Sequence, residues 1–258
     1  MADNTCIRPL ILITNDDSVE AQGLYRMIDA ALPHGDVIAV APQQPQSGMS
    51  SAFTIDRPLR IREYDDYNGA RIFSVNGTPV DCVKLALDTI VPRKPDFLFA
   101  GINHGSNSGN SIHYSGTMGA VNEGCTAGIT SAGFSLCDHS LRADFGLSMP
   151  LVSSLVDRII AEGLPDGISL NINIPAKVVP VGARVCRAAS GHWGAEYVRY
   201  SDPLARPFYM LTGYFVNEEP DATDTDMYWL ANNYISVVPV ELDRTAHHLI
   251  DSFGQYEK

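Results

Sequence analysis

The chain has 258 residues, of which 45% are hydrophobic, and a formal net charge of −12 at pH 7. This length and apolar content suffice for a sizeable core, in one large domain or one domain with an appendage. The negative charge disfavours partners held by a broad basic surface, such as duplex DNA, long RNA or an anionic membrane. A small anionic substrate would need local compensation from a metal or from backbone N–H groups.

The cysteine pattern and the N-terminus indicate a cytoplasmic protein. The cysteines are odd in number, widely scattered and without a C-x-x-C pair: Cys6, Cys82, Cys125, Cys137 and Cys186. This usage is typical of reduced thiols in a cytosolic chain. The first residues carry no cationic region, and the apolar run after them stops at Asp16, so neither a signal peptide nor a membrane span is expected.

Apolar runs alternate with helical spacing as far as about residue 175. Strands are expected at 11–15, 36–41, 96–100, 131–136 and 168–174, with helices at about 24–32, 78–90, 117–129 and 151–162. Thr78 and Pro79 provide a helix N-cap and first-turn proline. Two β-like runs within residues 52–75 flank Tyr67-Asn68-Gly69 and predict a hairpin. This order predicts an α/β fold with a doubly wound, mostly parallel sheet.

The pattern changes beyond Pro175 to a β-rich excursion. β-like segments are expected at 184–189, 195–200, 207–215 and 234–240, with helices near 224–231 and 245–253. The excursion is rich in aromatic residues: Trp193, Tyr197, Tyr200, Phe208, Tyr209, Tyr214 and Phe215. A hairpin cannot hide so much apolar area alone, so we expect an oligomer interface.

The final helix, with Leu249, Ile250 and Phe253 on one side, is expected to dock on a neighbouring subunit. A dimer is the default, and a tetramer is possible. The alternative is that both the excursion and this helix fold back on their own chain.

Two adjacent aspartates, Asp16 and Asp17, stand where the first predicted strand ends. Ligands of open α/β sheets bind beyond the carboxyl ends of the strands. Two neighbouring carboxylates repel each other and raise each other's pKa unless a cation lies between them. The pair therefore predicts a divalent metal site. The alternative is that one aspartate caps the next helix and the other is solvated.

Two further loops leave the same predicted edge of the sheet. Ser47 lies after the second strand, and Asn103 lies in the polar loop 101–116, which follows the strand that ends at Ala100. With the aspartates they form an all-oxygen set, which suits Mg²⁺, Mn²⁺ or Ca²⁺ better than zinc. Because two carboxylates and one divalent ion sum to about zero charge, a phosphate can approach the site.

Small residues from Tyr114 to Ala120 form a loop–helix junction. Backbone N–H groups at such a junction, with the positive end of a helix behind them, can bind an anion. The alternative is ordinary N-capping by a serine or threonine.

Several motifs together carry a family resemblance. They are Ile13-Thr14-Asn15-Asp16-Asp17, Ala41-Pro42 with Ser47-Gly48, Asn76-Gly77-Thr78-Pro79, the run from Gly101 to Gly109, Tyr114-Ser115-Gly116-Thr117 and Asn171-Ile172-Asn173-Ile174-Pro175. In this order, from about residue 10 to residue 240, the chain resembles the SurE (survival protein E) family of metal-dependent nucleotidases. The resemblance implies hydrolysis of nucleoside 5′- or 3′-monophosphates to nucleoside and phosphate.

The resemblance also implies an architecture and a set of site residues. Residues 1–175 would be a Rossmann-like catalytic core, and 176–258 an oligomerisation region that completes the same domain and exchanges segments in a homodimer or homotetramer. Each subunit would bind one Mg²⁺ or Mn²⁺. The implied metal ligands are Asp16, Asp17, Ser47 and Asn103, the implied phosphate contacts are Asn107, Ser115, Gly116 and Thr117, and Asn15 would join the two aspartates in catalysis.

The chain departs from the family pattern in the loop after the aspartates. Ser18 stands where the family usually has glycine, and Gln22-Gly23 where it has Pro-Gly. Neither is a ligand position, but a serine is less free than glycine to adopt a positive φ, so the loop's shape is expected to differ.

Two other functions use the same residues. One is a metal-dependent nucleotide sensor without turnover, and the other is a short-chain polyphosphatase. The sequence leaves open the preferred base, the ester position, the physiological metal and any general acid.

Overall fold

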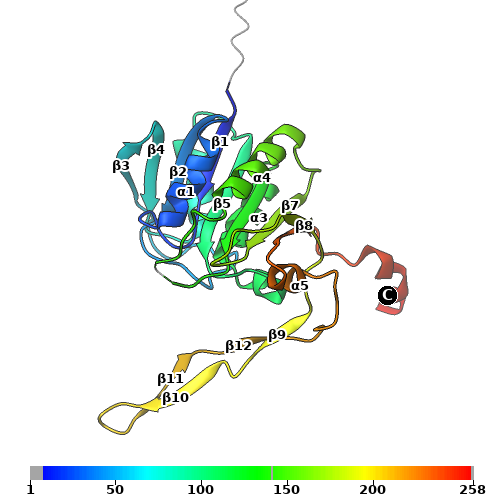
Figure 1. Cartoon of the computed structure of the whole chain (residues 1–258). Coiled ribbons are helices and arrows are strands. Elements are labelled where there is room, and N and C mark those ends of the chain that lie inside the picture. Colours follow the sequence, from blue (N-terminus) through cyan, green and yellow to red (C-terminus); the bar gives the residue numbers. More distant parts are fainter. Residues whose placement is uncertain (1–7, 141, 257–258) are drawn as a thin grey trace, which may run out of the picture.

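The computed structural model describes residues 8–140 and 142–256. Its centre is a nine-stranded sheet in the order β3-β4-β2-β1-β5-β6-β7-β13-β8 (Figure 1). Six strands run parallel: β1 (Leu10–Thr14), β2 (Asp36–Pro42), β4 (Ala70–Val75), β5 (Phe97–His104), β6 (Thr130–Leu136) and β7 (Ile168–Ile174). β3 (Ile61–Tyr67) and β13 (Ile235–Glu241) are antiparallel to β4 and β7, and β8 (Ala183–Val185) is parallel to β13. The predicted doubly wound α/β fold and the 52–75 hairpin are confirmed.

Helices cover both faces of the sheet. α1 (Gln22–Ala31) and α4 (Met149–Glu162) pack on one face, and α2 (Pro79–Leu85) and α3 (Gly116–Thr126) on the other. α2 continues into a π-helical turn, η1 (Ala86–Ile90). Along β1, Ile11 and Ile13 belong to the core under α1 and α4, while Leu10 and Leu12 belong to the core under α2 and α3. This burial on both faces explains the unbroken apolar run in the sequence.

The Thr78 cap fixes where α2 begins. The Thr78 hydroxyl accepts a hydrogen bond from the Asp81 N–H (3.1 Å), and the Asp81 carboxylate accepts one from the Thr78 N–H (2.8 Å). The two bonds form a capping box, which satisfies backbone donors that the first turn leaves free. The predicted N-cap is therefore confirmed.

The boundary between β1 and β5 is the topological switch point of the sheet. From β1 the chain turns to β2 on one side, and β5 later joins β1 on the other, so the loops after the two strands diverge. The predicted end of the 96–100 strand is wrong, because β5 continues to His104 with a shift of register against β6 between Ala100 and Asn103. Asn103 therefore lies on a strand and not in a loop.

The loop after β1 keeps a positive φ at a serine. Ser18 has φ of 105°, so this serine adopts the conformation that glycine takes more freely. Backbone hydrogen bonds from Val19 N–H to Pro42 O (2.8 Å) and from Ala21 N–H to Ser18 O (3.1 Å) hold the loop in place. Gly23 is needed for a different reason, because a Cβ there would lie 1.9 Å from the carbonyl oxygen of Ile102 in β5.

Beyond β8 the chain leaves the sheet as a long arm, which comprises residues 191–217 (Figure 1). β9 (Gly191–Gly194) pairs with β12 (Tyr214–Asn217), and β10 (Tyr197–Ser201) pairs with β11 (Pro207–Leu211), both antiparallel. The predicted single segment 207–215 is therefore interrupted, and β9 was not expected. α5 (Asp226–Ala231) follows the arm near the predicted helix 224–231.

The last segment, η3 (His247–Tyr256), is a 3-10 helix, so the α-helix predicted at 245–253 is wrong in type. It runs away from the sheet, at the red end of the chain in Figure 1. Leu249, Ile250 and Phe253 are 40%, 56% and 53% exposed. No residue of His247–Tyr256 is buried, so the apolar side chains of this segment add little to the core.

The cysteines of the described part are free thiols: Cys82 and Cys125 are buried, Cys137 and Cys186 partly buried, and Cys6 lies outside the described residues. None of the helices in residues 8–140 and 142–256 has the length and apolar character to cross a membrane.

Replacing Ser18 with glycine is expected to stabilise the protein. A non-glycine residue at positive φ costs roughly 1–3 kcal/mol, which exceeds the extra chain entropy of an unfolded glycine, so Ser18→Gly should raise the free energy of unfolding by about 1 kcal/mol. Urea unfolding of the metal-free protein measures this. Ser154→Gly, on the exposed face of α4, is the matched control and should lower stability by about 0.5 kcal/mol. A loss of stability in Ser18→Gly would contradict the strain at this position.

Candidate active site

A cavity of about 730 Å³ opens at the carboxyl ends of β1 and β5. It brings together five of the predicted site residues, which are Asp16, Ser47, Asn103, Asn107 and Ser115. Asn15, Asp17, Gly116 and Thr117 are not among the lining residues. The lining residues come from segments that lie far apart in the sequence, and the parallel sheet brings these segments to one edge.

Asp16 is a carboxylate with only 4% of its surface exposed. The Thr117 hydroxyl donates a hydrogen bond to its Oδ1 (2.6 Å), and the main-chain oxygen of Asp16 accepts one from the Gln46 N–H (2.7 Å). Burial raises the pKa of Asp16 to about 6; the Thr117 hydrogen bond opposes this rise, and the charge of Asp17 adds to it. A nearby cation would stabilise the ionised form of such a carboxylate.

Asp17 is not a lining residue of the cavity, but it is hydrogen-bonded to His104, which is one. Its Oδ2 accepts hydrogen bonds from the His104 backbone N–H (2.8 Å) and lies 3.2 Å from His104 Nδ1. The hydrogen bond to Asp17 raises the pKa of the His104 ring, which lines the cavity and packs edge-on against Phe145.

Asn103 and Ser47 complete the predicted oxygen set. The Asn103 amide nitrogen donates to the Gly105 carbonyl (2.9 Å), which leaves its amide oxygen for a ligand. Ser47 is exposed in the loop after β2. Carboxylate, amide and hydroxyl oxygens around a buried acid fit a hard divalent ion.

The α3 N-terminus packs against Asp16. The Ser115 hydroxyl accepts a hydrogen bond from the Met118 N–H (3.0 Å), so the N-capping interpretation of Ser115 is confirmed. A Cβ at Gly116 would lie 3.0 Å from Asp16 Oδ2, so a larger residue there would press on the Asp16 carboxylate. Thr117 is fully buried behind Asp16, where its hydroxyl is already used. Phosphate binding by this segment stays a prediction.

Asn107 is held by the two neighbouring strands. Its N–H donates to Asn173 Oδ1 (2.7 Å), its side-chain amide donates to Ser135 Oγ (2.8 Å), and its carbonyl accepts from the Asn171 amide (2.8 Å). Asn171 and Asn173 are fully buried on β7. Their spacing of two residues in a predicted strand, which puts both on one face, was the available signal for this role.

Asn15 is fully buried. Its amide nitrogen donates to the Ser18 carbonyl (2.8 Å), and its Oδ1 has no hydrogen-bond partner within the part of the chain that the structure describes. Its contacts shape the loop that carries the aspartates, and its catalytic role stays a prediction.

The outer wall of the cavity contains residues that sequence analysis did not assign to the site. They come from the loops and from the base of the arm: Tyr114, His139, Trp193, Glu196, Tyr197, Leu211 and Thr212. Trp193 was expected to serve packing or an interface. Because the arm reaches the cavity only through the tertiary fold, the sequence offers no spacing that would reveal this wall.

Comparison with known proteins agrees with this geometry. The family model "Survival protein SurE" matches residues 11–195. The chain belongs to the SurE family. The family resemblance of the motifs is thus confirmed. In individual SurE proteins the similarity covers nearly the whole of this chain.

Two of these relatives are named 5′-nucleotidase SurE. That of Phocaeicola vulgatus is 44% identical over 249 residues, covering 96% of this chain and 97% of the relative. That of Bacteroides fragilis is 41% identical over 250 residues, covering 97% and 98%. The crystal structure of the SurE protein from Aquifex aeolicus superposes with a TM-score of 0.83 at 32% identity, over 97% of this chain and all of that one.

In this SurE-family chain, Thr117 is expected to stabilise the buried Asp16. Thr117→Val keeps the shape of the side chain but removes the donor, and an unpaired buried polar group costs about 1–3 kcal/mol. Urea unfolding of the metal-free protein at neutral pH should show a loss of that size. Thr117→Ser retains the hydroxyl and should lose clearly less. Equal losses in both variants would assign the effect to packing of the methyl group.

Proposed function

We propose that this protein is a divalent-metal-dependent 5′-nucleotidase that hydrolyses nucleoside 5′- and 3′-monophosphates to nucleoside and phosphate. The near-full-length relatives named 5′-nucleotidase SurE support the activity. The observation that carries the proposal is the buried Asp16 carboxylate at the β1–β5 switch point, beside a cavity large enough for a nucleotide.

Asp16, Asp17, Ser47 and Asn103 would hold one Mg²⁺ or Mn²⁺ per subunit. The raised pKa of Asp16 and the oxygen character of the set support this assignment. A divalent ion supplies Lewis acidity to a phosphate oxygen and lowers the pKa of a bound water. Thr117 would orient Asp16, and His104 would orient Asp17, through the hydrogen bonds already described.

Asn107 and the Ser115–Thr117 segment would bind the phosphate. Asn173 and Asn171 hold the main chain of Asn107 and Ser135 holds its side-chain amide, so the residue needs no rearrangement to meet a substrate. Asn15 would assist by fixing the loop of the two aspartates. The nucleoside would then lie toward the wall formed by Tyr114 and Trp193.

Two alternatives share these residues and are separated by products. A nucleotide sensor would bind AMP with Mn²⁺ but release no phosphate. A short-chain polyphosphatase would release more than one phosphate from each molecule of a short polyphosphate.

The partners we propose are a small nucleotide and further copies of the same chain, with neither duplex nucleic acid nor a membrane. The free thiols agree with a cytoplasmic location. Exposed apolar side chains on the arm and on η3 support a homodimer or homotetramer, among them Tyr197, Tyr209, Leu211, Ile250 and Phe253.

Hydrolysis of AMP is the first experiment. With Mn²⁺ or Mg²⁺ the protein should release inorganic phosphate, and EDTA should abolish the release. Asp17→Asn removes a charged ligand and should lower the rate roughly a hundredfold or more. Asp65→Asn, on the exposed β3 strand, is the matched control and should keep the wild-type rate. Full activity in EDTA, or in Asp17→Asn, would falsify the metal assignment.

The assembly is tested by removing the terminal segment. We expect light scattering to give a mass of two or four chains for the full protein, because a monomer would leave the apolar residues of the arm and η3 in water. Truncation after Asp243 removes η3 and should lower the assembly state. A concentration-independent mass of one chain for the full protein would overturn the proposal.

A further inference from the structure

Asp226, the first residue of α5, joins three separate segments with one carboxylate. Its Oδ2 accepts a hydrogen bond from the Gly109 N–H (2.7 Å), and its Oδ1 accepts from the N–H groups of Ala189 (2.9 Å) and Met227 (2.8 Å). The side chain has no exposed surface. Gly109 begins the 3-10 turn η2 (Gly109–His113), and Ala189 leads into the arm. The carboxylate therefore connects the wall of the active site to the root of the arm.

Further contacts bring the same two segments together. The Asn110 side chain donates a hydrogen bond to the Gly191 carbonyl. A Cβ at Gly109 would lie 2.8 Å from the Phe215 ring of β12 and 3.1 Å from the Ala189 carbonyl oxygen, and Gly109 has φ of 54°. Only glycine permits this approach, so the close packing of η2 on the arm root is built into the chain.

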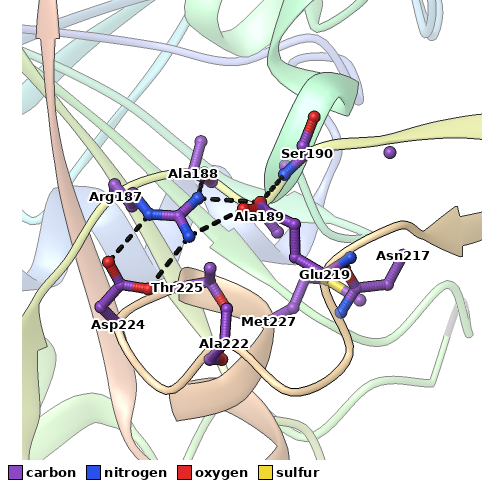
Figure 2. A network of polar contacts seen from close by, with 12 residues as sticks. Arg187, Ala188, Ala189, Ser190, Asn217, Glu219, Ala222, Asp224, Thr225 and Met227 are labelled. Carbon is purple, nitrogen blue, oxygen red and sulfur yellow. Dashed lines mark hydrogen bonds and ion pairs between the residues drawn. The ribbon is translucent and has the colours of Figure 1, made fainter.

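Arg187 also holds the residues at the root of the arm, where the chain enters and leaves it (Figure 2). Its guanidinium donates to Glu219 (2.8 and 2.9 Å) and to Asp224 (2.9 and 3.0 Å), and Glu219 in turn accepts from the Ser190 N–H (2.7 Å). The main chain adds a bond from the Asp226 N–H to the Arg187 carbonyl (2.9 Å). Both the outgoing and the returning strand of the arm are thus fixed next to α5.

These contacts position the outer wall of the cavity. They do not involve the end of the cavity where Asn107 lies, which is the proposed phosphate site. Ser111 in η2 and Tyr114 just after it line the cavity, and so do Trp193 in β9 and Tyr197 at the start of β10. Asn107 has its own hydrogen bonds to β6 and β7, and it lies two residues before the Gly109 N–H that Asp226 accepts from. The part of the substrate that meets the outer wall is the nucleoside.

We propose that Asp226 is a positioning residue for the nucleoside: it holds η2 and the arm root at the spacing that lets both contact the leaving group. The proposal rests on the nucleotidase function proposed above. A carboxylate suits this place because three N–H donors converge on it and both of its oxygens accept. An amide there would turn one N–H donor toward another.

The test is Asp226→Asn, which keeps the size of the side chain and removes one acceptor. With Mn²⁺, the KM for AMP and the dissociation constant of adenosine, measured by calorimetry, should each rise about tenfold, as expected for one hydrogen bond with a misplaced partner. The kcat for AMP and the affinity for inorganic phosphate should stay within about threefold of wild type. A purely structural role would weaken adenosine and phosphate binding together.

Two further variants complete the experiment. Asp221→Asn, exposed on the loop before α5, is the matched control and should leave all four quantities at wild-type values. Asn110→Ala breaks the second link between η2 and the arm and should weaken adenosine binding selectively but less, which keeps the test open if Asp226→Asn does not fold.

Equal losses for adenosine and phosphate in folded Asp226→Asn, or no change in it, would overturn the proposal, as would unchanged adenosine affinity in Asn110→Ala. Calorimetry with adenosine needs no turnover, so a wild-type protein that releases no phosphate from AMP would refute the proposed activity separately.

Discussion

Asp16 is a carboxylate buried at the end of β1, where the sheet's topology switches direction and where water cannot compensate its charge. The surrounding structure is arranged to tolerate it. Thr117 donates to one oxygen, Gly116 allows the α3 N-terminus to approach, and the loop from β2 closes over the backbone through Gln46. The α3 N-terminus and the loop after β2 are therefore both placed by contacts with this one buried acid.

The site has an inner and an outer part with different supports. The inner part rests on the parallel strands, because Asn171 and Asn173 of β7 and Ser135 of β6 hold Asn107 through buried hydrogen bonds. Buried polar networks of this kind rigidify a core when their members are hydrogen-bonded. The outer part rests on the arm, whose contact with the core depends on Asp226 and Arg187. The inner part of the site is thereby tied to the fold of the core, and the outer part to the arm.

Sequence analysis succeeded where local signals and burial agree. Strands such as β1 and β7, buried on both faces, show continuous apolar runs, and the Thr78-Pro79 pair marks a helix start by its own backbone chemistry. It failed where long-range contacts override local preference. β5 runs past Gly101 because β6 pairs with Asn103 and His104, and Ser18 keeps a positive φ because backbone bonds to the β2 loop fix its neighbours.

The sequence by itself determined the doubly wound sheet and the candidate oxygen ligands, since both follow from periodicity and from residue types at strand ends, which are local properties. The family resemblance came from the order of the motifs. Only the tertiary structure decided which candidates share the cavity, that Thr117 supports Asp16, and that Trp193 forms a wall. It also showed that Asp226 is buried. Most of these relations join residues far apart in sequence, and no local spacing encodes which distant donors converge on a buried acid.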